Sequence, residues 1–240
     1  MVGGASSLLG PRGAALAALL GLLLAYYALV GHLWEASLWW DIAWLAVALI
    51  PAVFGLVALA LPLRRWRGLA AGAVVLGAVA AVCEVVSADV AANFAKLAAV
   101  ALFAWWFLGF FEALSWVVGV ACVIPFVDAY SVWRGPTKHI VEHQREVFTT
   151  LSVAFPVPGG DGAANLGLPD VLFFSLFLAA AARFGLRVRA TWVGMAVGIG
   201  ATMALAVGLD AGGLPALPLI SAGFLLPNAD LVWRRLRARR

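Results

Sequence analysis

The sequence predicts an all-α, polytopic membrane protein, a bundle of about eight transmembrane helices. Hydrophobic residues make up 65% of the 240 residues and charged residues only 12%, and the mean hydropathy is +1.02. A soluble domain carries roughly 25% charged residues, so a chain this apolar cannot bury its apolar surface within itself. The apolar residues also fall into runs of about 20, the length that a helix needs to cross the hydrocarbon core.

Eight apolar runs are separated by charged residues, turn residues and tryptophans, which are typical of membrane interfaces. The runs are Gly13–Leu33, Trp39–Leu61, Gly68–Ser87, Asn93–Phe111, Ala113–Trp133, Asn165–Phe184, Thr191–Leu209 and Leu214–Trp233, with a turn at Glu112. We divide the chain into an N-terminal half, residues 1–111, with about four helices and no motif, and a C-terminal half, residues 112–240, which holds the candidate catalytic residues.

The distribution of basic residues predicts the orientation of the bundle. With eight helices, one side collects 12 of the 16 basic residues, and the other collects Lys96, Arg134, Lys138 and Arg145. The larger group is Arg12, Arg64, Arg65, Arg67, Arg183, Arg187, Arg189, Arg234, Arg235, Arg237, Arg239 and Arg240. Because basic residues concentrate in cytoplasmic segments, we expect a multi-pass protein with both termini in the cytoplasm.

The long loop Arg134–Ala164 is then expected on the non-cytoplasmic side. Its first part has the pattern of an amphipathic surface helix, because five apolar residues fall on one face. These residues are Ile140, Val141, Val147, Phe148 and Leu151. Its last part, Pro156–Gly162, is rich in proline and glycine, which predicts a flexible segment.

Two acids lie inside apolar runs, where an ionisable side chain is costly and indicates function. Asp128 lies about five residues before the end of one run, and Asp170 about five residues after the start of the next. The two helices are consecutive and therefore antiparallel. At 1.5 Å per residue, both carboxylates are expected ~7–8 Å inside the same membrane face.

Two carboxylates in contact cannot both stay charged, so they hold one proton between them. The ionised member can take a proton from water while the protonated member polarises a carbonyl, which is aspartic protease chemistry. Such acids also serve as proton or cation ligands in transporters, or find separate structural partners. The spacing of Asp128 and Asp170 alone favours these other interpretations taken together.

Three motifs around these acids resemble the presenilin type of intramembrane aspartyl protease, in family order and at compatible spacing. Phe126–Val132, followed by Arg134–Pro136 and then Val141–Glu142, is similar to the first catalytic helix and the segment after it. Leu166–Ser175 is similar to the second catalytic helix, and Leu214–Pro218 matches the Pro-Ala-Leu-Pro signature that opens the last helix. The resemblance covers about Glu112 to Trp233, half of the chain, and implies a short, prokaryotic-like member of the presenilin and signal peptide peptidase superfamily.

The resemblance implies roles for particular residues. Asp128 and Asp170 would be the catalytic pair, while Gly167 and Leu168 would shape the backbone beside Asp170. The segment after the penultimate helix would line the site with non-helical backbone, which is tolerated at membrane depth only inside the protein or beside a wet cavity. Its residues are Leu214, Pro215, Ala216, Leu217 and Pro218.

The chain departs from the family pattern at three points. Val127 stands where the family usually has tyrosine, and Pro169 stands where it has glycine. Proline is tolerated in the first turn of a helix, but it fixes the backbone beside Asp170. The family usually has nine helices, whereas eight runs are visible here.

A second motif, His139-Ile140-Val141-Glu142-His143, fits the H-x-x-E-H pattern of inverted zinc proteases. Both histidines would share one helical face and could bind zinc. No convincing third ligand is visible on another element. The same stretch is better explained as the segment that follows the first catalytic helix, so we expect no metal and no cofactor.

The sequence therefore predicts hydrolysis of peptide bonds in or near transmembrane helices by water, with Asp128 and Asp170 sharing the acid and base roles. The expected partners are transmembrane helices of substrate proteins and the lipid bilayer, without nucleic acid and without obligatory subunits. The alternatives are an ion-coupled transporter or channel that uses the same acids, and a protease-derived scaffold that binds membrane segments without cutting them. Pro169 is the departure from the family pattern that favours the scaffold alternative.

Overall fold

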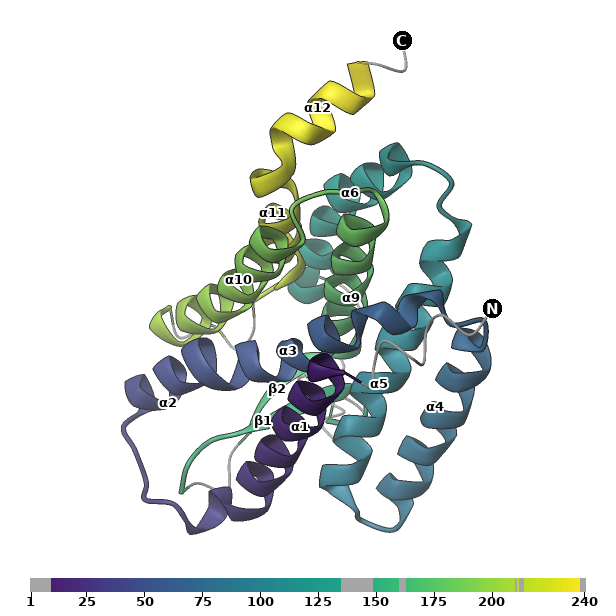
Figure 1. Cartoon of the computed structure of the whole chain (residues 1–240). Coiled ribbons are helices and arrows are strands. Elements are labelled where there is room, and N and C mark those ends of the chain that lie inside the picture. The colour runs from purple at the N-terminus through teal and green to yellow at the C-terminus, as the bar shows by residue number, and fades with distance from the viewer. Residues whose placement is uncertain (1–9, 135–148, 160–162, 210, 212–213, 238–240) are drawn as a thin grey trace.

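The fold is a mostly helical bundle with one small sheet (Figure 1). It is described from a computed structural model, which covers residues 10–134, 149–159, 163–209, 211 and 214–237. The predicted surface helix in the long loop falls mainly on residues 135–148, outside the described residues.

The N-terminal half contains five α-helices. They are α1 (Pro11–Leu29), α2 (Leu38–Trp44), α3 (Ile50–Ala60), α4 (Leu69–Val85) and α5 (Asp89–Phe107). A π-helical turn over Leu45–Leu49 joins α2 to α3, so these two form one interrupted rod that matches a single predicted run. Pro51 lies just after this turn, and its missing N–H accounts for the irregularity.

The described residues of the C-terminal half include five further α-helices of known bounds and the sheet. The helices are α6 (Leu114–Arg134), α9 (Leu168–Arg183), α10 (Val188–Gly208), α11 (Leu217–Leu225) and α12 (Ala229–Arg237). The sheet is an antiparallel pair of β1 (Ser152–Pro156) and β2 (Ala163–Gly167), in which Ser152 lies opposite Gly167 and Ala154 opposite Asn165. The hairpin lies beside α1, whose Tyr26 and Tyr27 bond to β1, and beside α5 (Figure 1).

Five helical segments in the described part of the chain are long and apolar enough to cross a membrane. They are Pro11–His32, Leu38–Arg65, Asp89–Phe110, Leu114–Arg134 and Val188–Gly208. The helices of the other three predicted runs, α4, α9 and α11, are shorter. These apolar helices support the prediction of a membrane protein, and the mostly helical architecture is consistent with an all-α bundle.

Two predicted helix boundaries were wrong. The run predicted to start at Asn165 does not begin as a helix, because Asn165 to Gly167 pair with β1 and α9 starts only at Leu168. The run predicted to start at Leu214 is not helical up to Ala216, and α11 starts at Leu217. A 3₁₀ turn at Pro227 then separates α11 from α12, because proline cannot continue the hydrogen-bond ladder.

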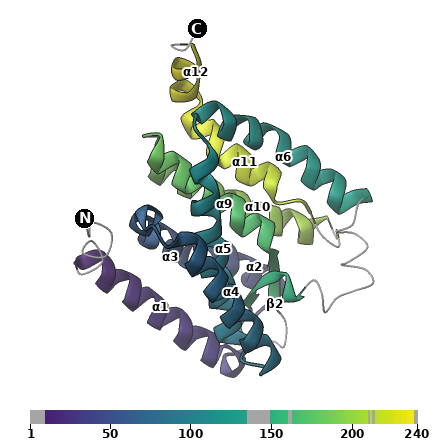
Figure 2. The same ribbon diagram turned by 90° about the vertical axis from the view of Figure 1, so that its right-hand side faces the viewer.

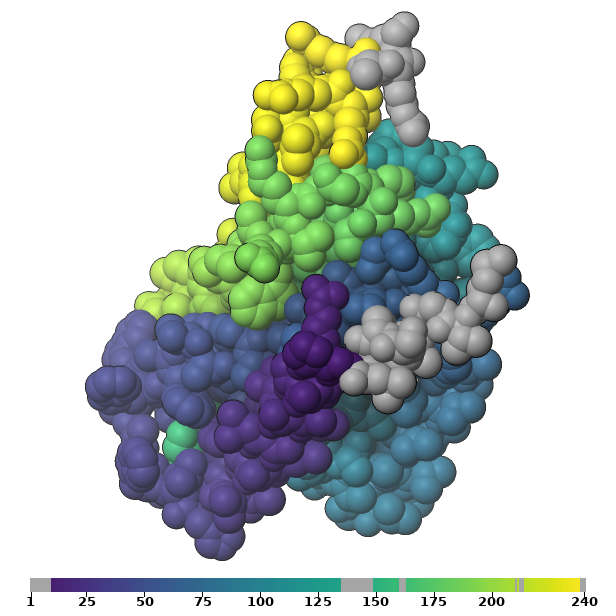
Figure 3. Space-filling view, viewed as in Figure 1, coloured from purple at the N-terminus to yellow at the C-terminus, as the bar shows by residue number. Residues whose placement is uncertain are grey.

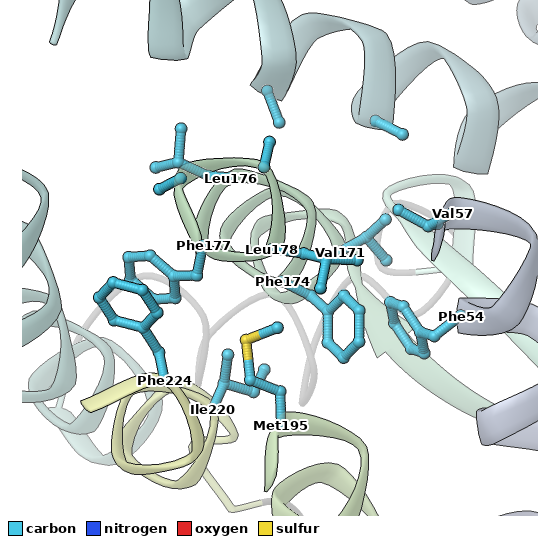
Figure 4. Close-up of a cluster of buried hydrophobic side chains, with 14 of the residues drawn as sticks. Phe54, Val57, Val171, Phe174, Leu176, Phe177, Leu178, Met195, Ile220 and Phe224 are labelled. Atoms are coloured by element: carbon cyan, nitrogen blue, oxygen red, sulfur yellow. The ribbon is translucent and has the colours of Figure 1, made fainter. Parts of the chain in front are cut away.

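Helix α9 is the centre of the molecule and joins its two halves. It is apolar on all sides, which is typical of a buried helix, and it packs against α5 on one side and against α10 and α11 on the other. The ring centroids of Phe174 and Phe54 in α3 are 4.0 Å apart, and the ring of Phe177 stacks on that of Phe224 in α11 with 4.9 Å between centroids (Figure 4). One hydrophobic core therefore spans both halves of the chain.

Helices α10 and α11 pack closely through glycine residues. A Cβ atom at Gly194 would lie 2.7 Å from the Gly223 carbonyl oxygen, and one at Gly198 would lie 2.7 Å from that of Leu219. Only glycine permits such backbone contact. The spacing of Gly194 and Gly198, one helical turn apart, therefore fixes where α11 lies, and Figure 2 shows α11 between α10 and α6.

Arginines that follow α9 and α11 gather at one end of the bundle. Arg187 pairs with Asp230 at 2.5 and 2.9 Å, Arg183 donates to the Leu108 carbonyl, and Arg235 donates to the Phe184 carbonyl. In Figure 3, α12 (yellow) projects beyond α10 at this end, while α1 and α2 occupy the lower part of the same face.

Candidate active site

Asp128 is held by the start of another helix. It lies on α6, six residues before the end of that helix, and is partly buried. Its Oδ2 accepts a hydrogen bond of 3.0 Å from the backbone N–H of Leu217, the first residue of α11. The first N–H groups of a helix have no partner within the helix, so Asp128 satisfies one of them from a distance of 89 residues along the chain.

The residues around Leu217 explain why this N–H is available. Ala216 stands at the cap position and has no side chain that could accept a hydrogen bond. Pro218, the next residue, has no N–H at all. The Leu217 N–H therefore carries the positive end of the α11 dipole to the Asp128 carboxylate. The non-helical backbone implied by the resemblance is found from Leu214 to Ala216, but Leu217 and Pro218 form the first turn of α11 instead.

Asp170 also lies at the start of a helix. It is the third residue of α9, after the cap residue Gly167, Leu168 and Pro169. Its side chain turns back toward the Gly167 backbone, where an added Cβ would lie 3.4 Å from Asp170 Oδ2. An acid that reaches back from the third helical position to the cap is the second half of a capping box.

The predicted position of Asp170 within its helix was therefore wrong, but its helix packs against the helix of Asp128. Asp170 lies three residues into a helix rather than about five, because the preceding residues belong to β2. Helix α6 still contacts α9. This contact places Asp128 and Asp170 on neighbouring helices, as two carboxylates that share one proton must be.

The two departures from the family pattern have different surroundings. Val127 is 53% exposed and lies on the outer surface of α6, which Figure 2 shows at the edge of the bundle. Pro169 is the second residue of α9, where the predicted compatibility with a first helical turn is confirmed. Gly167 has a φ of −59°, which any residue adopts, so its lack of a side chain provides space beside Asp170 rather than an unusual backbone.

The sequence analysis missed a group of polar residues that holds the hairpin. Asn93 on α5 is only 5% exposed, and its side-chain amide makes two hydrogen bonds with the backbone of Ala154 in β1, at 2.7 and 3.0 Å. The hydroxyls of Tyr27 and Tyr26 donate to the carbonyls of Ala154 and Pro156, at 2.7 and 2.8 Å. An asparagine inside an apolar run was the available signal, since buried amides need partners.

The residues of the alternative zinc motif, His139, Glu142 and His143, lie outside the described residues. Within the part of the chain that the structure describes, no three histidine, cysteine or acidic residues cluster in the manner of a metal site.

Comparisons of the chain with protein-family models, curated proteins and solved structures gave no significant match.

Proposed function

We propose that this chain is an intramembrane aspartyl protease of the presenilin type, with Asp128 and Asp170 as its catalytic pair. The single observation that best supports this is the hydrogen bond from the Leu217 N–H to Asp128 Oδ2. It joins the first motif to the third, and the second motif lies beside them because α9, which carries Asp170, packs against α6 and α11. Three segments selected by sequence resemblance alone thus converge on one pair of acids.

The proposed reaction is the hydrolysis of a peptide bond by water. The ionised carboxylate takes a proton from water as the water oxygen bonds to the scissile carbonyl carbon, and the protonated carboxyl donates its proton to the carbonyl oxygen. The resulting gem-diol collapses when its C–N bond breaks, with a proton passing to the leaving nitrogen. The products are a carboxylic acid and an amine, and the pair again holds one proton.

A helical substrate must unwind before this reaction, because its backbone hydrogen bonds shield the scissile carbonyl. The unwound backbone groups then need partners inside the membrane. The outer edge of β2 supplies such partners, since an extended peptide can add to a sheet edge by main-chain hydrogen bonds. β2 leads within three residues of its end to Asp170, so a peptide on this edge lies beside the catalytic pair.

The decisive experiment is cleavage of a generic transmembrane peptide by the purified chain in detergent. Wild type should cleave, and Asp128→Asn and Asp170→Asn should each abolish cleavage, because each removes one half of a shared-proton unit. The asparagine at position 128 retains an oxygen that can accept from Leu217, which separates chemistry from folding. Activity should fall at both low and high pH, since the pair works only when it holds one proton, and a zinc chelator should have no effect.

The outcomes discriminate among the functions. Robust proteolysis by either aspartate variant would show that Asp128 and Asp170 are not the catalytic pair. Solute flux into liposomes that depends on the same acids, without cleavage, would indicate a transporter. Peptide binding without cleavage would indicate a scaffold.

A further inference from the structure

The outer edge of β1 is closed by side chains from the N-terminal half. Asn93 Oδ1 accepts from the Ala154 N–H at 2.7 Å, and Asn93 Nδ2 donates to the Ala154 carbonyl at 3.0 Å. The Tyr27 hydroxyl donates to the same carbonyl at 2.7 Å. The amide of Asn93 therefore occupies the position that a neighbouring strand would take.

Contacts at both ends of β1 extend this closure. At its C-terminal end, the Tyr26 hydroxyl donates to the Pro156 carbonyl at 2.8 Å and accepts from Trp44 Nε1 at 2.9 Å. Just before its N-terminal end, Lys96 donates to the carbonyls of Thr149 and Thr150, at 3.4 Å each, while it is paired with Glu84 at 2.8 Å.

The direction of these bonds determines which edge of the hairpin is open. In an antiparallel pair, the N–H and C=O of one residue point to the same side, and directly opposite residues are alternately bonded to each other and turned outward. Ala154 directs both groups at Asn93, so Ala154 and its opposite residue Asn165 form an outward-facing pair. The backbone N–H and C=O of Asn165 therefore face the other edge, and within the described residues they have no backbone partner.

We propose that Asn93 and Tyr27 are positioning residues for the protease reaction. They close the β1 edge and hold the hairpin in register, so that an extended peptide pairs only along β2, next to Asp170. This inference rests on the proposed function and gives the motif-free N-terminal half a role. Asn93 on α5 holds Ala154, and Ala154 lies opposite Asn165 in the sheet. The strand of Asn165 ends at Gly167, three residues before Asp170, so the position of the hairpin bears on that of Asp170.

The position of the cut is the readout that separates positioning from simple stability. Asn93→Leu removes both hydrogen bonds to Ala154 at similar volume, and Tyr27→Phe removes a single hydroxyl. A hairpin free to shift by a fraction of a residue misplaces the scissile carbonyl, and a misplacement of 1 Å can cost about a hundredfold in rate. We expect kcat to fall roughly ten- to hundredfold in Asn93→Leu and less in Tyr27→Phe, with KM changed little.

The cleavage products of a transmembrane peptide should be mapped by mass spectrometry for each variant. Wild type should cut mainly at one bond, and Asn93→Leu should cut at several neighbouring bonds. Asn93→Gln keeps the amide group and should restore part of the rate and of the single cut. The matched control is Thr202→Val, which removes a buried hydrogen bond to Gly198 within α10, far from the hairpin along the chain; it should leave the cut unchanged.

The failures of the two proposals are distinguishable. If wild type cleaves and the aspartate variants do not, but Asn93→Leu and Tyr27→Phe cut at the wild-type bond with the wild-type kcat, the positioning role is wrong and the protease assignment stands. If wild type does not cleave any transmembrane peptide, both are wrong. If Asn93→Leu does not fold, the milder Tyr27→Phe decides the question by its product pattern.

Discussion

Asp128 and Asp170 are each placed at the N-terminus of a helix, by two different local arrangements. Asp170 folds back onto the cap of its own helix, whereas Asp128 accepts from the first N–H of α11. Helix N-termini favour negative charge, so these positions support the ionised member of a pair that lies among apolar side chains. At this scale, a backbone N–H is as important to the site as any side chain.

The Leu217 N–H can be tested by a proline substitution. Proline is accepted at the first position of a helix, so Leu217→Pro should leave α11 in place while it deletes the donor to Asp128. A hydrogen bond to a charged group contributes about 1.5–3 kcal/mol, so kcat/KM for a transmembrane peptide should fall roughly ten- to hundredfold. Leu217→Ala is the control, because it loses the same buried side chain but keeps the N–H. Equal activity in the two variants would show that the hydrogen bond is not used.

Pro169 is the second residue-scale test. Pro169→Gly restores the glycine of the family and frees the backbone beside Asp170, so it should raise the cleavage rate or broaden the range of peptides that are cut. The greater freedom of glycine in the unfolded chain should lower the free energy of unfolding by about 0.4–1 kcal/mol. Unchanged rates over several peptides would show that this departure is neutral.

At the scale of elements, the close contact between α10 and α11 determines the place of the Leu217 N–H. A Cβ at Gly223 would overlap the backbone of Gly194, and one at Gly194 would lie 2.7 Å from the Gly223 oxygen. Helix α11 has only nine residues, so it cannot absorb a shift at one end without moving the other. The hydrogen bond to Asp128 therefore depends on a glycine contact more than one helical turn away.

Gly223→Ala should separate these helices. Overpacking of this kind costs roughly 1–3 kcal/mol, so the midpoint of thermal unfolding in detergent should fall and the cleavage rate should fall with it. Gly77→Ala in α4 is the matched control, because a Cβ there has no atom within 4 Å. That variant should be unaffected or slightly stabilised, by up to about 1 kcal/mol. A wild-type midpoint in Gly223→Ala would contradict the packing argument.

At the scale of the whole molecule, charge separates the two ends of the bundle. Arg183, Arg187 and Arg235 lie at one end with partners there. The hairpin, with Lys96 beside it, lies at the other. This is the segregation on which the predicted orientation depends.

We expect the hairpin and the opening of the catalytic pair to face the non-cytoplasmic side. This is the arrangement of signal peptide peptidases, although the motifs resemble presenilin, whose corresponding loop is cytosolic. The reason is that eight arginines, three after α9 and five after α11, would otherwise lie on the unfavourable side of the bilayer. A reporter that is active only in the cytoplasm, inserted near Gly160, should be silent. An active reporter there would reverse the orientation.

Much of the molecule was determined by the sequence itself. Runs of apolar residues predicted where the helices lie, since period and length are local properties, and short motifs predicted Asp128, Asp170 and the segment at Leu217. The helix starts predicted at Asn165 and Leu214 were wrong. Asn165 belongs to a strand, and the proline-containing segment from Leu214 to Ala216 precedes the helix.

The tertiary structure alone decided how these parts meet. The pairing of β1 with β2 joins residues as few as 7 positions apart. The bonds from Leu217 to Asp128 and from Asn93 to Ala154 join residues 89 and 61 positions apart. Every residue except proline carries both a backbone N–H and a C=O, so the sequence does not show which of them find partners in the fold. Their partners are determined only when helices pack, because a buried polar group must then find the partner that the fold brings within reach.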